Sequence, residues 1–426
     1  MNSTENGNVY ASIITIGDEL LIGQVIDTNS AWMASQLNTA GIWVKRRVAI
    51  GDKREDIIRA LNEESNEAHI ILITGGLGPT ADDITKPVLA EYFGGKLIID
   101  AGALQNVEQI FARLNRPMIT RNYKQAEVPD VCTVIQNKRG TAPGMWFEKN
   151  GKIFVSMPGV PHEMKGMMTD YVLPRLPEYF KMPFIVSSTL LTAGAGESFL
   201  AELINDFEQK LPAGIKLAYL PNYGMVRLRL TGIGVQKEEI EAEVASQFAA
   251  LKILVTEYLV TDEDDPLEVV VAKLLKKNHK TLSTAESCTG GYISHLLTIE
   301  PGASQFFKGS VVSYSNEIKQ HVLYVPEEIL QTTGAVSEAT VQEMVKGAIA
   351  LLQTDYAIAV SGIMGPDGGS VEKPVGTVWV AVGDQHRIVT QKYNFRFDRK
   401  RNIELTANNA LNQLRKFVVE SGIEKD

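Results

Sequence analysis

The sequence has 426 residues, a formal net charge of −9 and two cysteines. A chain of this length exceeds one ordinary hydrophobic core, so we expect two or three domains. The hydrophobic share of 44% and the charged share of 22% are typical of a globular protein, and no apolar run approaches the roughly 18 residues that a membrane span needs. The acidic balance argues against a dedicated nucleic-acid binder, whose affinity depends on neutralising phosphates.

The two cysteines, Cys132 and Cys288, lie far apart in the sequence. A disulfide framework is therefore disfavoured and a reducing compartment is favoured. The first eight residues, MNSTENGN, are polar and lack the apolar segment of a secretory signal. No HExxH or CxxC pairing occurs, which argues against a closed zinc site. From these features we expect a cytoplasmic protein without a membrane segment.

The first segment alternates strands with helices. β-branched and apolar runs predict strands, and periodic apolar patterns predict helices. The expected strands are 10–17, 42–51, 69–76 and 152–159, and the expected helices are 30–41, 53–68 and 105–116. This alternation predicts a parallel sheet covered by helices on both faces. We therefore expect a three-layer α/β domain in residues 1–178.

Residues 179–260 have a different pattern of predicted strands and helices. Strand-like stretches at 185–198 and 215–234 alternate with helical stretches at 199–211 and 237–252. This pattern predicts a small α+β module, for which an RNA-binding fold of the KH type is one interpretation. Because the module carries more acidic than basic residues, we favour a structural or substrate-covering role over nucleic-acid binding.

Residues 261–426 form a third predicted domain, again of the α/β class. Its expected strands are 281–285, 309–315, 356–362, 376–383 and 387–395. Its expected helices begin near residues 288, 317, 338 and 398. Ser337 and Asp398 are placed to cap the last two helices, because their side-chain oxygens accept hydrogen bonds from the free N–H groups of a first turn.

In the first domain, the string TGGLGPTADDIT begins at Thr74, where a buried strand ends. Ligands of open α/β sheets bind at this end of the strands. Glycines there let backbone N–H groups approach phosphate oxygens, and the following helix start adds free donors. We therefore predict that this loop binds phosphate through Gly75, Gly76, Gly78 and Thr80.

Carboxylates accompany this loop and two other strand ends. Asp82 and Asp83 follow the glycines, ITIGDELLIGQVIDTNS supplies acidic residues and Asn29, and SMPGVPHEM supplies Pro158, Gly159 and Glu163. Carboxylate oxygens suit a divalent cation that holds phosphates. The predicted metal ligands are Asp18, Glu19, Asp27 and Asp83. The alternative is that each stretch is a tight strand-to-helix turn with acidic first-turn residues, but three such turns together favour a functional site.

Four stretches of the first domain, GDELLIGQVIDTNS, TGGLGPTADDIT, GTAPGMW and MPGVPHEM, resemble the N-terminal domain of the CinA family. That domain is similar to the molybdopterin-binding fold of molybdenum-cofactor proteins. The resemblance implies metal-dependent hydrolysis of ADP-ribose to AMP and ribose 5-phosphate. A divalent cation, whose identity the sequence leaves open, would offset the pyrophosphate charge and activate water.

In the last domain, Ser287 lies in TAESCTGG between a predicted strand and a predicted helix, which exposes its hydroxyl beside free N–H groups. A serine needs a nearby base to become a nucleophile. The His residues of this domain lack a matching context, whereas SVVSYSNEIK offers Tyr314 and Lys319. A desolvated lysine with a lowered pKa can serve as the base, and Tyr314 could relay the proton or steady the lysine. Oxyanion donors are expected from the N–H groups of Thr289, Gly290 and Gly291.

Two further strings of this domain suggest anion binding. The Gly-rich string SGIMGPDGGSVEKPVGTVW, with Gly365 and Gly368, is expected to shape the substrate site. FRFDRKRNIEL gathers basic residues at a helix start, namely Arg396, Arg399, Lys400 and Arg401. Cations there gain nothing from the helix dipole, so they favour a bound anion. A solvated basic turn is the alternative.

Cys288 is the rival nucleophile, because a thiol is intrinsically stronger than a hydroxyl. No His or other activating partner occurs near it in the sequence. We therefore rank Cys288 below Ser287 and expect it to be a small buried apolar side chain.

The strings TAESCTGG, VVSYSNEIK, GAVSE, SGIMGPDGG, KPVGTVW and FDRKR resemble the C-terminal domain of the CinA family. The resemblance implies a nicotinamide mononucleotide amidohydrolase that needs no cofactor. It places the family's nucleophile at Ser287, its Tyr and Lys at Tyr314 and Lys319, and its substrate-binding Arg at Arg399. It also implies a homodimer. The alternative from another class is a protein that binds a pterin or nucleotide without reaction, in a competence or DNA-damage response.

Overall fold

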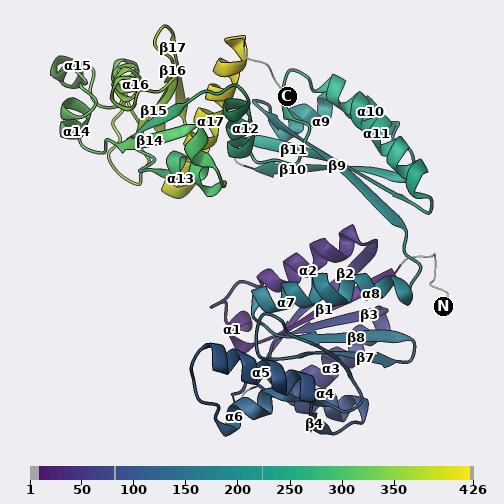
Figure 1. The fold of residues 1–426 in the computed structure, drawn as a ribbon. Helices are drawn as coiled ribbons and strands as arrows, with labels where there is room; N and C mark the ends of the chain where they lie inside the picture. Colours follow the sequence, from purple (N-terminus) through teal and green to yellow (C-terminus); the bar gives the residue numbers. More distant parts are fainter. Residues whose placement is uncertain (1–8, 81–82, 223, 423–426) are drawn as a thin grey trace. The chain divides into compact units, whose positions relative to one another are not determined.

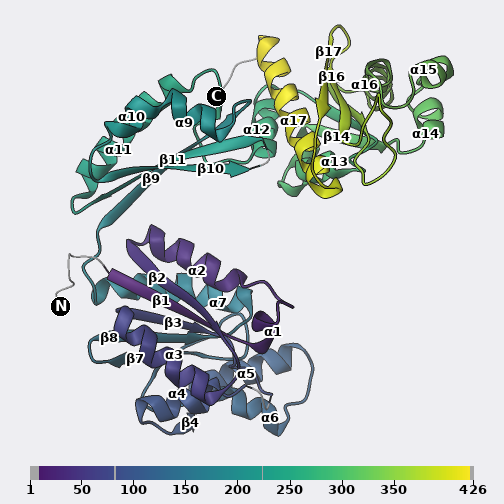
Figure 2. The same ribbon diagram turned by 180° about the vertical axis from the view of Figure 1, so that it is seen from behind.

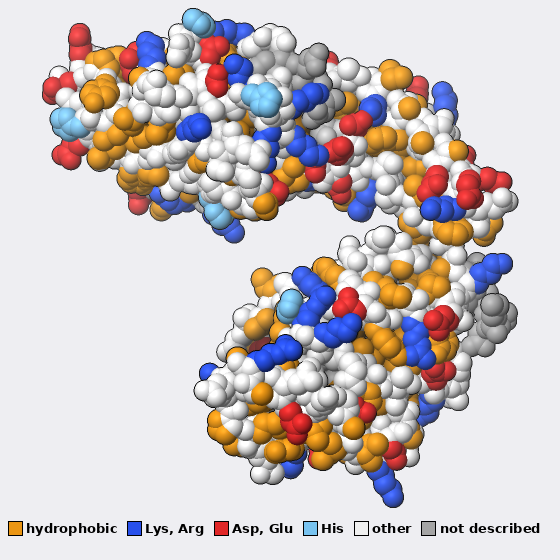
Figure 3. Space-filling view, in the orientation of Figure 1, with side chains coloured by type: hydrophobic (Ala, Val, Ile, Leu, Met, Phe, Trp, Pro, Cys, Tyr) orange, Lys and Arg blue, Asp and Glu red, His pale blue; other side chains and the backbone are white. Residues whose placement is uncertain are grey.

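The computed structural model describes residues 9–80, 83–222 and 224–422. These residues group into two compact units, one of residues 9–186 with 232–243 and the other of residues 187–231 with 244–422. On the face drawn in Figure 3, acidic and basic side chains are interspersed over both units. Across the described ranges, no helix has both the length and the apolar character that crossing a membrane would require.

The first domain contains a six-stranded sheet (Figure 1). Its strands, in spatial order, are β2 (Ile42–Ile50), β1 (Val9–Ile16), β3 (Ile70–Thr74), β8 (Lys152–Met157), β7 (Gly144–Lys149) and β6 (Thr133–Ile135). The first four strands are parallel, but β7 and β6 pair antiparallel. The expectation of a purely parallel sheet was therefore wrong at this edge. Asn150 and Gly151, both with positive φ, form the two-residue turn that folds β7 back onto β8.

Helices cover both faces of this sheet. The helices of this domain are α1 (Asp18–Leu21), α2 (Thr28–Thr39), α3 (Arg54–Glu67), α4 (Thr85–Phe93), α5 (Ala101–Arg113), α6 (Thr120–Tyr123), α7 (Pro161–Met167) and α8 (Leu173–Arg175). Met33 of α2 and Met164 of α7 pack with Ile13 on one face, while Leu61 of α3 and Leu89 of α4 pack with the neighbouring Ile14 on the other. Because successive strand residues point to opposite faces, both faces of β1 are buried. The three-layer prediction is confirmed. A separate two-stranded sheet joins β4 (Leu97–Ile99) and β5 (Glu127–Pro129).

The middle module is α+β, as predicted (Figure 2). Its sheet has the spatial order β10 (Ile215–Asn222), β11 (Met225–Gly234), β9 (Phe184–Ala193) and β12 (Leu259–Thr261). Its helices are α9 (Glu197–Leu203), α10 (Asn205–Gln209) and α11 (Lys237–Leu254).

The last domain contains a five-stranded sheet. Its strands, in spatial order, are β14 (Phe307–Val312), β13 (Leu282–Glu286), β15 (Tyr356–Gly362), β16 (Thr377–Gly383) and β17 (Ile388–Asn394). The first three are parallel and the last two run antiparallel. Its helices are α12 (Leu267–Lys277), α13 (Tyr292–Ile299), α14 (Asn316–His321), α15 (Glu327–Thr332), α16 (Glu338–Leu352) and α17 (Arg399–Glu420).

The helices of the last domain also form two layers around the sheet. Residues of α12, α13 and α17 share one hydrophobic cluster with the sheet, and residues of α16 share another on the opposite face. Both predicted caps are confirmed, because Ser337 accepts from the N–H of Thr340 and Asp398 accepts from the N–H of Arg401. The start of α17 lies close to the Gly-rich loop that follows β15, because Arg399 Nη1 donates to the carbonyl of Gly365.

Candidate active site

Two neighbouring parallel strands bring the predicted nucleophile and base together. β13 ends at Glu286 and β14 ends at Val312, and these two residues are partners in the strand register. The chain leaves both strands at the carboxyl edge of the sheet, where ligands of α/β folds bind. Beyond β14, helix α14 returns the Lys319 side chain toward β13. As a result, Lys319 Nζ lies 3.0 Å from Ser287 Oγ.

The Lys319 amine is held in a buried and largely uncharged setting. Its side chain is 1% exposed, and Nζ donates to the carbonyl oxygens of Ser313 at 2.6 Å and Tyr314 at 3.4 Å. Burial lowers the pKa of Lys319 below its ordinary value. A neutral amine has two N–H bonds, which these carbonyls can accept, and one lone pair, which can accept the Ser287 proton. The arrangement therefore suits a serine activated by a lysine.

Cys288 is unsuited to compete with Ser287. Its side chain is buried in the apolar cluster shared by α12, α13 and α17. This burial raises the pKa of the Cys288 thiol to about 12. The thiol is therefore protonated at neutral pH, whereas a thiolate would be the reactive form.

The side chains of Tyr314 and Arg399 contact each other, away from the amine of Lys319. Arg399 Nη2 donates to Tyr314 Oη at 3.1 Å, and Arg399 Nη1 donates to the carbonyl of Gly365 at 2.8 Å. The Tyr314 side chain is 62% exposed. Within the described residues, no hydrogen bond joins Tyr314 Oη to Lys319 or Ser287. The carbonyl of Tyr314 contacts the lysine, and its hydroxyl contacts the arginine, so the geometry favours a steadying role over a proton relay.

The Gly-rich loop is tied to the start of α17 by a side chain that was not predicted. Asn402 is fully buried, and its Nδ2 donates to the carbonyls of Met364 at 3.1 Å and Phe397 at 3.0 Å. Gly365 thereby reaches Arg399, while Gly368 lies three residues further along with a φ of +91°. This left-handed conformation favours glycine. No hydrogen bond of the described residues joins Gly368 to Ser287 or Arg399.

The predicted oxyanion donors are not equivalent. The N–H of Gly290 donates to the carbonyl of Ser287 at 3.2 Å, and the N–H of Gly291 donates to Glu286 Oε2 at 3.1 Å. Both groups are therefore occupied within the protein. Over the part of the chain that the structure describes, no acceptor takes the N–H of Thr289. Of the three predicted oxyanion donors, Thr289 therefore stays the candidate and the two glycines do not.

In the first domain, the loop expected to bind phosphate closes on its own carboxylate. Asp83 accepts from the N–H of Gly78 at 2.8 Å, from the N–H of Thr80 at 2.9 Å and from the Thr80 hydroxyl. The N–H of Gly75 donates to Met157 at 3.2 Å. Contrary to the prediction, these N–H groups do not face outward. The loop uses them to donate to acceptors within the protein, namely Asp83 and the carbonyl of Met157. Gly76 occupies a left-handed conformation with a φ of +64°.

The four carboxylates predicted to bind a metal are not gathered at one point. Asp18 exchanges hydrogen bonds with Asp52, Asp27 caps α2 by accepting from the N–H of Ser30, and Asp83 closes its own loop. Asp82 lies outside the described residues. Within those residues, no three His, Cys, Asp or Glu side chains are arranged to hold one ion. The predicted ligand set therefore does not fit a single metal ion, and dependence on a divalent metal stays a prediction.

Glu19 and Asp27 nevertheless line one cavity at the carboxyl ends of β1 and β3. The cavity has a volume of about 130 Å³, and its other lining residues include Ile16, Val25, Ile26, Asn29, Thr74, Gly75 and Gly159. Asn29 Nδ2 donates to the carbonyl of Gly159 at 2.7 Å and so joins two of the predicted strand ends. Asn29 Oδ1 is buried and has no hydrogen-bond partner among the described residues. The three strand ends singled out in the sequence therefore meet at one place.

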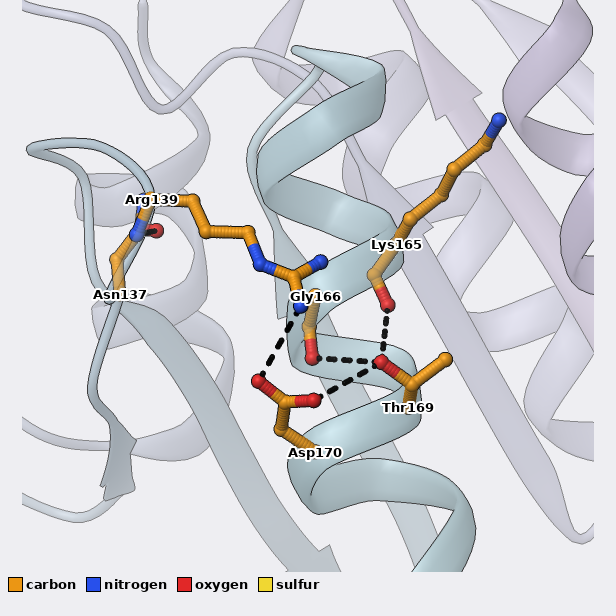
Figure 4. A network of polar contacts seen from close by, with 6 residues as sticks. All are labelled: Asn137, Arg139, Lys165, Gly166, Thr169 and Asp170. Carbon is orange, nitrogen blue, oxygen red and sulfur yellow. Dashed lines mark hydrogen bonds and ion pairs between the residues drawn. The ribbon is translucent and has the colours of Figure 1, made fainter. Parts of the chain in front are cut away.

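A second cavity of the first domain lies beside α7. Its volume is about 160 Å³, and Asn137, Arg139, Glu163 and Asp170 are among its lining residues. Figure 4 shows the polar network that joins the loop after β6 to the helical turn after α7, including the ion pair between Arg139 and Asp170 at 3.6 Å. Asn137 Nδ2 donates to Glu163 Oε2 at 2.6 Å, and burial raises the pKa of Glu163. This network fixes the loop that contains the GTAPG sequence.

The whole chain has close relatives. It is 45% identical over 415 residues to a CinA-like protein of Cytophaga hutchinsonii, with 97% of this chain and 99% of the relative covered. This chain belongs to the CinA family. It is also 43% identical over 413 residues to a CinA-like protein of Flavobacterium psychrophilum, covering 96% and 99% of the two chains.

Family descriptions match all three parts of this CinA protein. Residues 12–178 match "Probable molybdopterin binding domain", residues 187–260 match "Damage-inducible protein CinA KH domain", and residues 264–418 match "CinA C-terminal domain". A solved CinA superfamily protein of Klebsiella pneumoniae is 38% identical, covers 36% of this chain and 96% of its own, and has a TM-score of 0.36.

One buried carboxylate of the CinA C-terminal domain was not predicted as a site residue. Glu286 is fully buried directly before Ser287. Its Oε1 accepts from the N–H of Ser294 at 2.8 Å, and its Oε2 accepts from the N–H of Ile293 at 3.0 Å. An N-cap normally stands immediately before its helix, whereas Glu286 precedes Tyr292, the first residue of α13, by six positions. No local sequence signal therefore marks it.

Proposed function

We propose that the C-terminal domain of this CinA protein deamidates nicotinamide mononucleotide to nicotinate mononucleotide and ammonia. The observation that carries the proposal is the 3.0 Å approach of Ser287 Oγ to the buried amine of Lys319. Membership of the CinA family supports the substrate, since the motifs of this domain resemble those of its amidohydrolases. Ammonia release from nicotinamide mononucleotide by the purified chain is the direct test. Binding of this nucleotide without ammonia would favour the non-catalytic alternative.

Acylation uses the two side chains in turn. Ser287 Oγ attacks the carboxamide carbon while Lys319 Nζ takes the hydroxyl proton. The negative charge develops on the carboxamide oxygen, where the free N–H of Thr289 can stabilise it. Lys319 then gives the proton to the amide nitrogen, the carbon–nitrogen bond breaks, and ammonia leaves. Ser287 is left as an ester of the pyridine carboxylate.

Deacylation repeats the sequence with water. Lys319, neutral again, takes a proton from a water molecule that attacks the ester carbon. The carbon–Oγ bond breaks, and Ser287 Oγ recovers a proton from Lys319. The product is nicotinate mononucleotide. Because these steps use only side chains and water, we expect deamidation to be unaffected by a metal chelator.

Arg399 is proposed to bind the phosphate of the nucleotide. Its guanidinium is oriented by Gly365 and Tyr314, and it begins α17, where free N–H groups also favour anions. We expect Arg399→Ala to raise the KM for nicotinamide mononucleotide by about 10- to 100-fold, because a charge-assisted hydrogen bond contributes about 1.5–3 kcal/mol. The kcat should change much less. Steady-state ammonia release over a substrate series measures both constants.

Arg401 supplies the matched control for this prediction. It lies in the same helical turn, but its guanidinium stacks on the ring of Phe397 at 4.0 Å. Arg401→Ala should leave the KM within about threefold of the wild-type value, since the loss of a rim cation changes binding little. Equal effects of the two substitutions would show that the turn acts only through its general positive charge, and the assignment to Arg399 would be wrong.

We further propose that the N-terminal domain hydrolyses ADP-ribose to AMP and ribose 5-phosphate. The cavity at the ends of β1 and β3 supports this proposal, because Glu19, Asp27 and Asn29 offer polar groups beside the apolar Val25 and Ile26. Such a mixture is typical of small-molecule sites. Among the described residues, the carboxylates do not form a metal site.

Glu19 offers a test of the N-terminal proposal. Glu19→Gln should lower AMP formation from ADP-ribose by about tenfold or more, because it removes the charge of one of the two carboxylates lining the cavity. Glu55→Gln is the control, since Glu55 is an exposed carboxylate of α3. Chromatographic separation of AMP, with and without a chelator, also tests the metal. Full activity of Glu19→Gln would exclude this cavity as the reaction site, and full activity with chelator would exclude the cation.

A further inference from the structure

Glu286 makes more hydrogen bonds than a helix cap requires. Its side chain is 0% exposed. Its carboxylate accepts from five donors: Thr284 Oγ1 at 3.3 Å, Thr289 Oγ1 at 2.7 Å, and the N–H groups of Gly291 at 3.1 Å, Ile293 at 3.0 Å and Ser294 at 2.8 Å. Three of these donors belong to the start of α13, and one is the side chain of the residue two positions after Ser287.

The backbone of Glu286 is itself anchored. The N–H of Ser313 donates to the Glu286 carbonyl at 2.8 Å, and the N–H of Ser287 donates to Val360 at 3.0 Å. The residue is thus fixed between β14 and β15, and its carboxylate forms a rigid support for the turn that follows. The start of α13 is fully engaged by this support, so its dipole and N–H groups are not available to the substrate.

We propose that Glu286 is a positioning residue for the serine reaction, because its hydrogen bond to Thr289 Oγ1 aims the N–H of Thr289 at the oxyanion. The inference rests on the proposed amidase function. Thr289 is 4% exposed, and its side chain is held on one side by Glu286 while its N–H has no acceptor among the described residues. Loss of the hydroxyl would let the turn rotate, and a donor displaced by a fraction of an ångström loses much of its electrostatic effect.

The alternative, that Glu286 is only a structural cap of α13, predicts a different result. If Glu286 only stabilises α13, any lost hydrogen bond to its carboxylate should lower the melting temperature and leave the reaction unchanged. Thr284 and Thr289 provide a matched pair for this comparison. Both are buried threonines whose hydroxyls lie within hydrogen-bond distance of Glu286, and Thr284 Oγ1 also lies 2.7 Å from Ser310 Oγ. Thr284 lies on β13, whereas Thr289 lies in the turn beside Ser287.

The experiment compares Thr289→Val, Thr289→Ser and Thr284→Val with the wild-type chain, with Glu286→Gln as a second test of the carboxylate. The rate at which a fluorophosphonate probe labels Ser287 is measured below the melting temperature of each variant. In this reaction Ser287 Oγ gives its proton to Lys319 and bonds to phosphorus, fluoride leaves, and the phosphoryl oxygen occupies the oxyanion position. Steady-state kcat and KM for nicotinamide mononucleotide are measured in parallel.

We expect Thr289→Val to lower both the labelling rate and the kcat by about 10- to 100-fold with little change in KM, a smaller loss than removing an oxyanion donor outright. Thr289→Ser keeps the hydroxyl and should stay within about threefold of wild type, as should Thr284→Val. Glu286→Gln should lower the labelling rate and the kcat about as much as Thr289→Val does, because the amide group of Gln places its N–H donors against backbone N–H donors.

Three results would overturn the inference. The first is that Ser287 is labelled at the wild-type rate in Thr289→Val. The second is that Thr284→Val lowers the labelling rate as much as Thr289→Val does. The third is that Thr289→Ser does not keep the labelling rate near the wild-type value. Failure of the proposed function is seen separately. If wild-type Ser287 reacts with the probe but the chain releases no ammonia from nicotinamide mononucleotide, the substrate is wrong, and the role of Glu286 is decided by the labelling rates alone. Wild-type chain that does not label at Ser287 contradicts both.

Discussion

Ser287→Ala is expected to lower ammonia release from nicotinamide mononucleotide by at least about a thousandfold, because removing the nucleophile of a covalent hydrolase leaves only binding and oxyanion stabilisation. The hydroxyl lies 3.0 Å from Lys319 Nζ at the carboxyl edge of the sheet, and the alanine removes only that atom. The variant should still bind the nucleotide, since Arg399 and the Gly-rich loop are untouched. Coupled detection of ammonia and equilibrium binding by calorimetry measure the two properties.

Cys288→Ala is the matched control for this substitution. The thiol is buried, its pKa is raised to about 12, and its removal deletes one buried atom of the apolar cluster. The kcat should stay within about threefold of the wild-type value, while the melting temperature falls slightly because a small cavity is left. The opposite pattern, with Cys288→Ala inactive and Ser287→Ala active, would transfer the nucleophile to the thiol.

Lys319→Met should lower the kcat by about 10²- to 10⁴-fold, which is the usual contribution of a general base. Methionine keeps the length of the side chain without its amine. Lys86→Met is the control, because Lys86 is likewise a buried lysine but belongs to the first domain. It should leave deamidation unchanged. A Lys319→Met variant with wild-type kcat would show that another group takes the Ser287 proton.

The wild-type chain and the Lys319→Met variant should differ in how their kcat/KM and their stability depend on pH. Only neutral Lys319 can accept the proton, so wild-type kcat/KM should rise with pH through the lowered pKa of Lys319, below its ordinary value of 10.5. The unfolded chain binds this proton more tightly than the folded chain does. Protonation of Lys319 therefore costs stability below the lowered pKa, and the cost fades as pH rises toward 10.5. Lys319→Met should lose the rise in rate and be at least as stable at neutral pH.

The sequence predicted the fold class well because its signals are local and agree with one another. β15 and β16 are short, mainly apolar runs bounded by turn residues, and Ser337 and Asp398 mark helix starts by their own side chains. The antiparallel β7 was missed although the Asn150–Gly151 turn is a strong hairpin signal. Alternation of strands and helices on either side of it favoured a purely parallel sheet.

The approach of Ser287 and Lys319 could be anticipated because each follows the end of a predicted strand. Parallel neighbours place such ends at one edge, and the register of Glu286 with Val312 does so here. The role of Glu286 could not be anticipated, because it depends on how the turn folds back over the carboxylate. The same limit applies to Asn402, whose amide joins two carbonyls that are far apart in the sequence.

In the first domain, the sequence indicated where the strand ends meet but not which groups the carboxylates bind. Its three strand ends do meet, because Asn29 Nδ2 donates both to the carbonyl of Gly159 and to the hydroxyl of Thr74. The partners of its carboxylates could not be read from spacing, because Asp83 satisfies N–H groups of its own loop and Asp27 satisfies a helix start. An acidic residue beside a glycine loop is equally suited to hold a cation or to close the loop. The choice depends on backbone angles that the sequence does not display.

Mass spectrometry of chain quenched with acid during the first turnover of nicotinamide mononucleotide examines the bond-breaking step itself. We predict that the peptide containing Ser287 gains the mass of the pyridine-carbonyl nucleotide, and that Ser287→Ala shows no such gain. Release of one equivalent of ammonia while the Ser287 peptide keeps its unmodified mass would contradict the acyl-enzyme route.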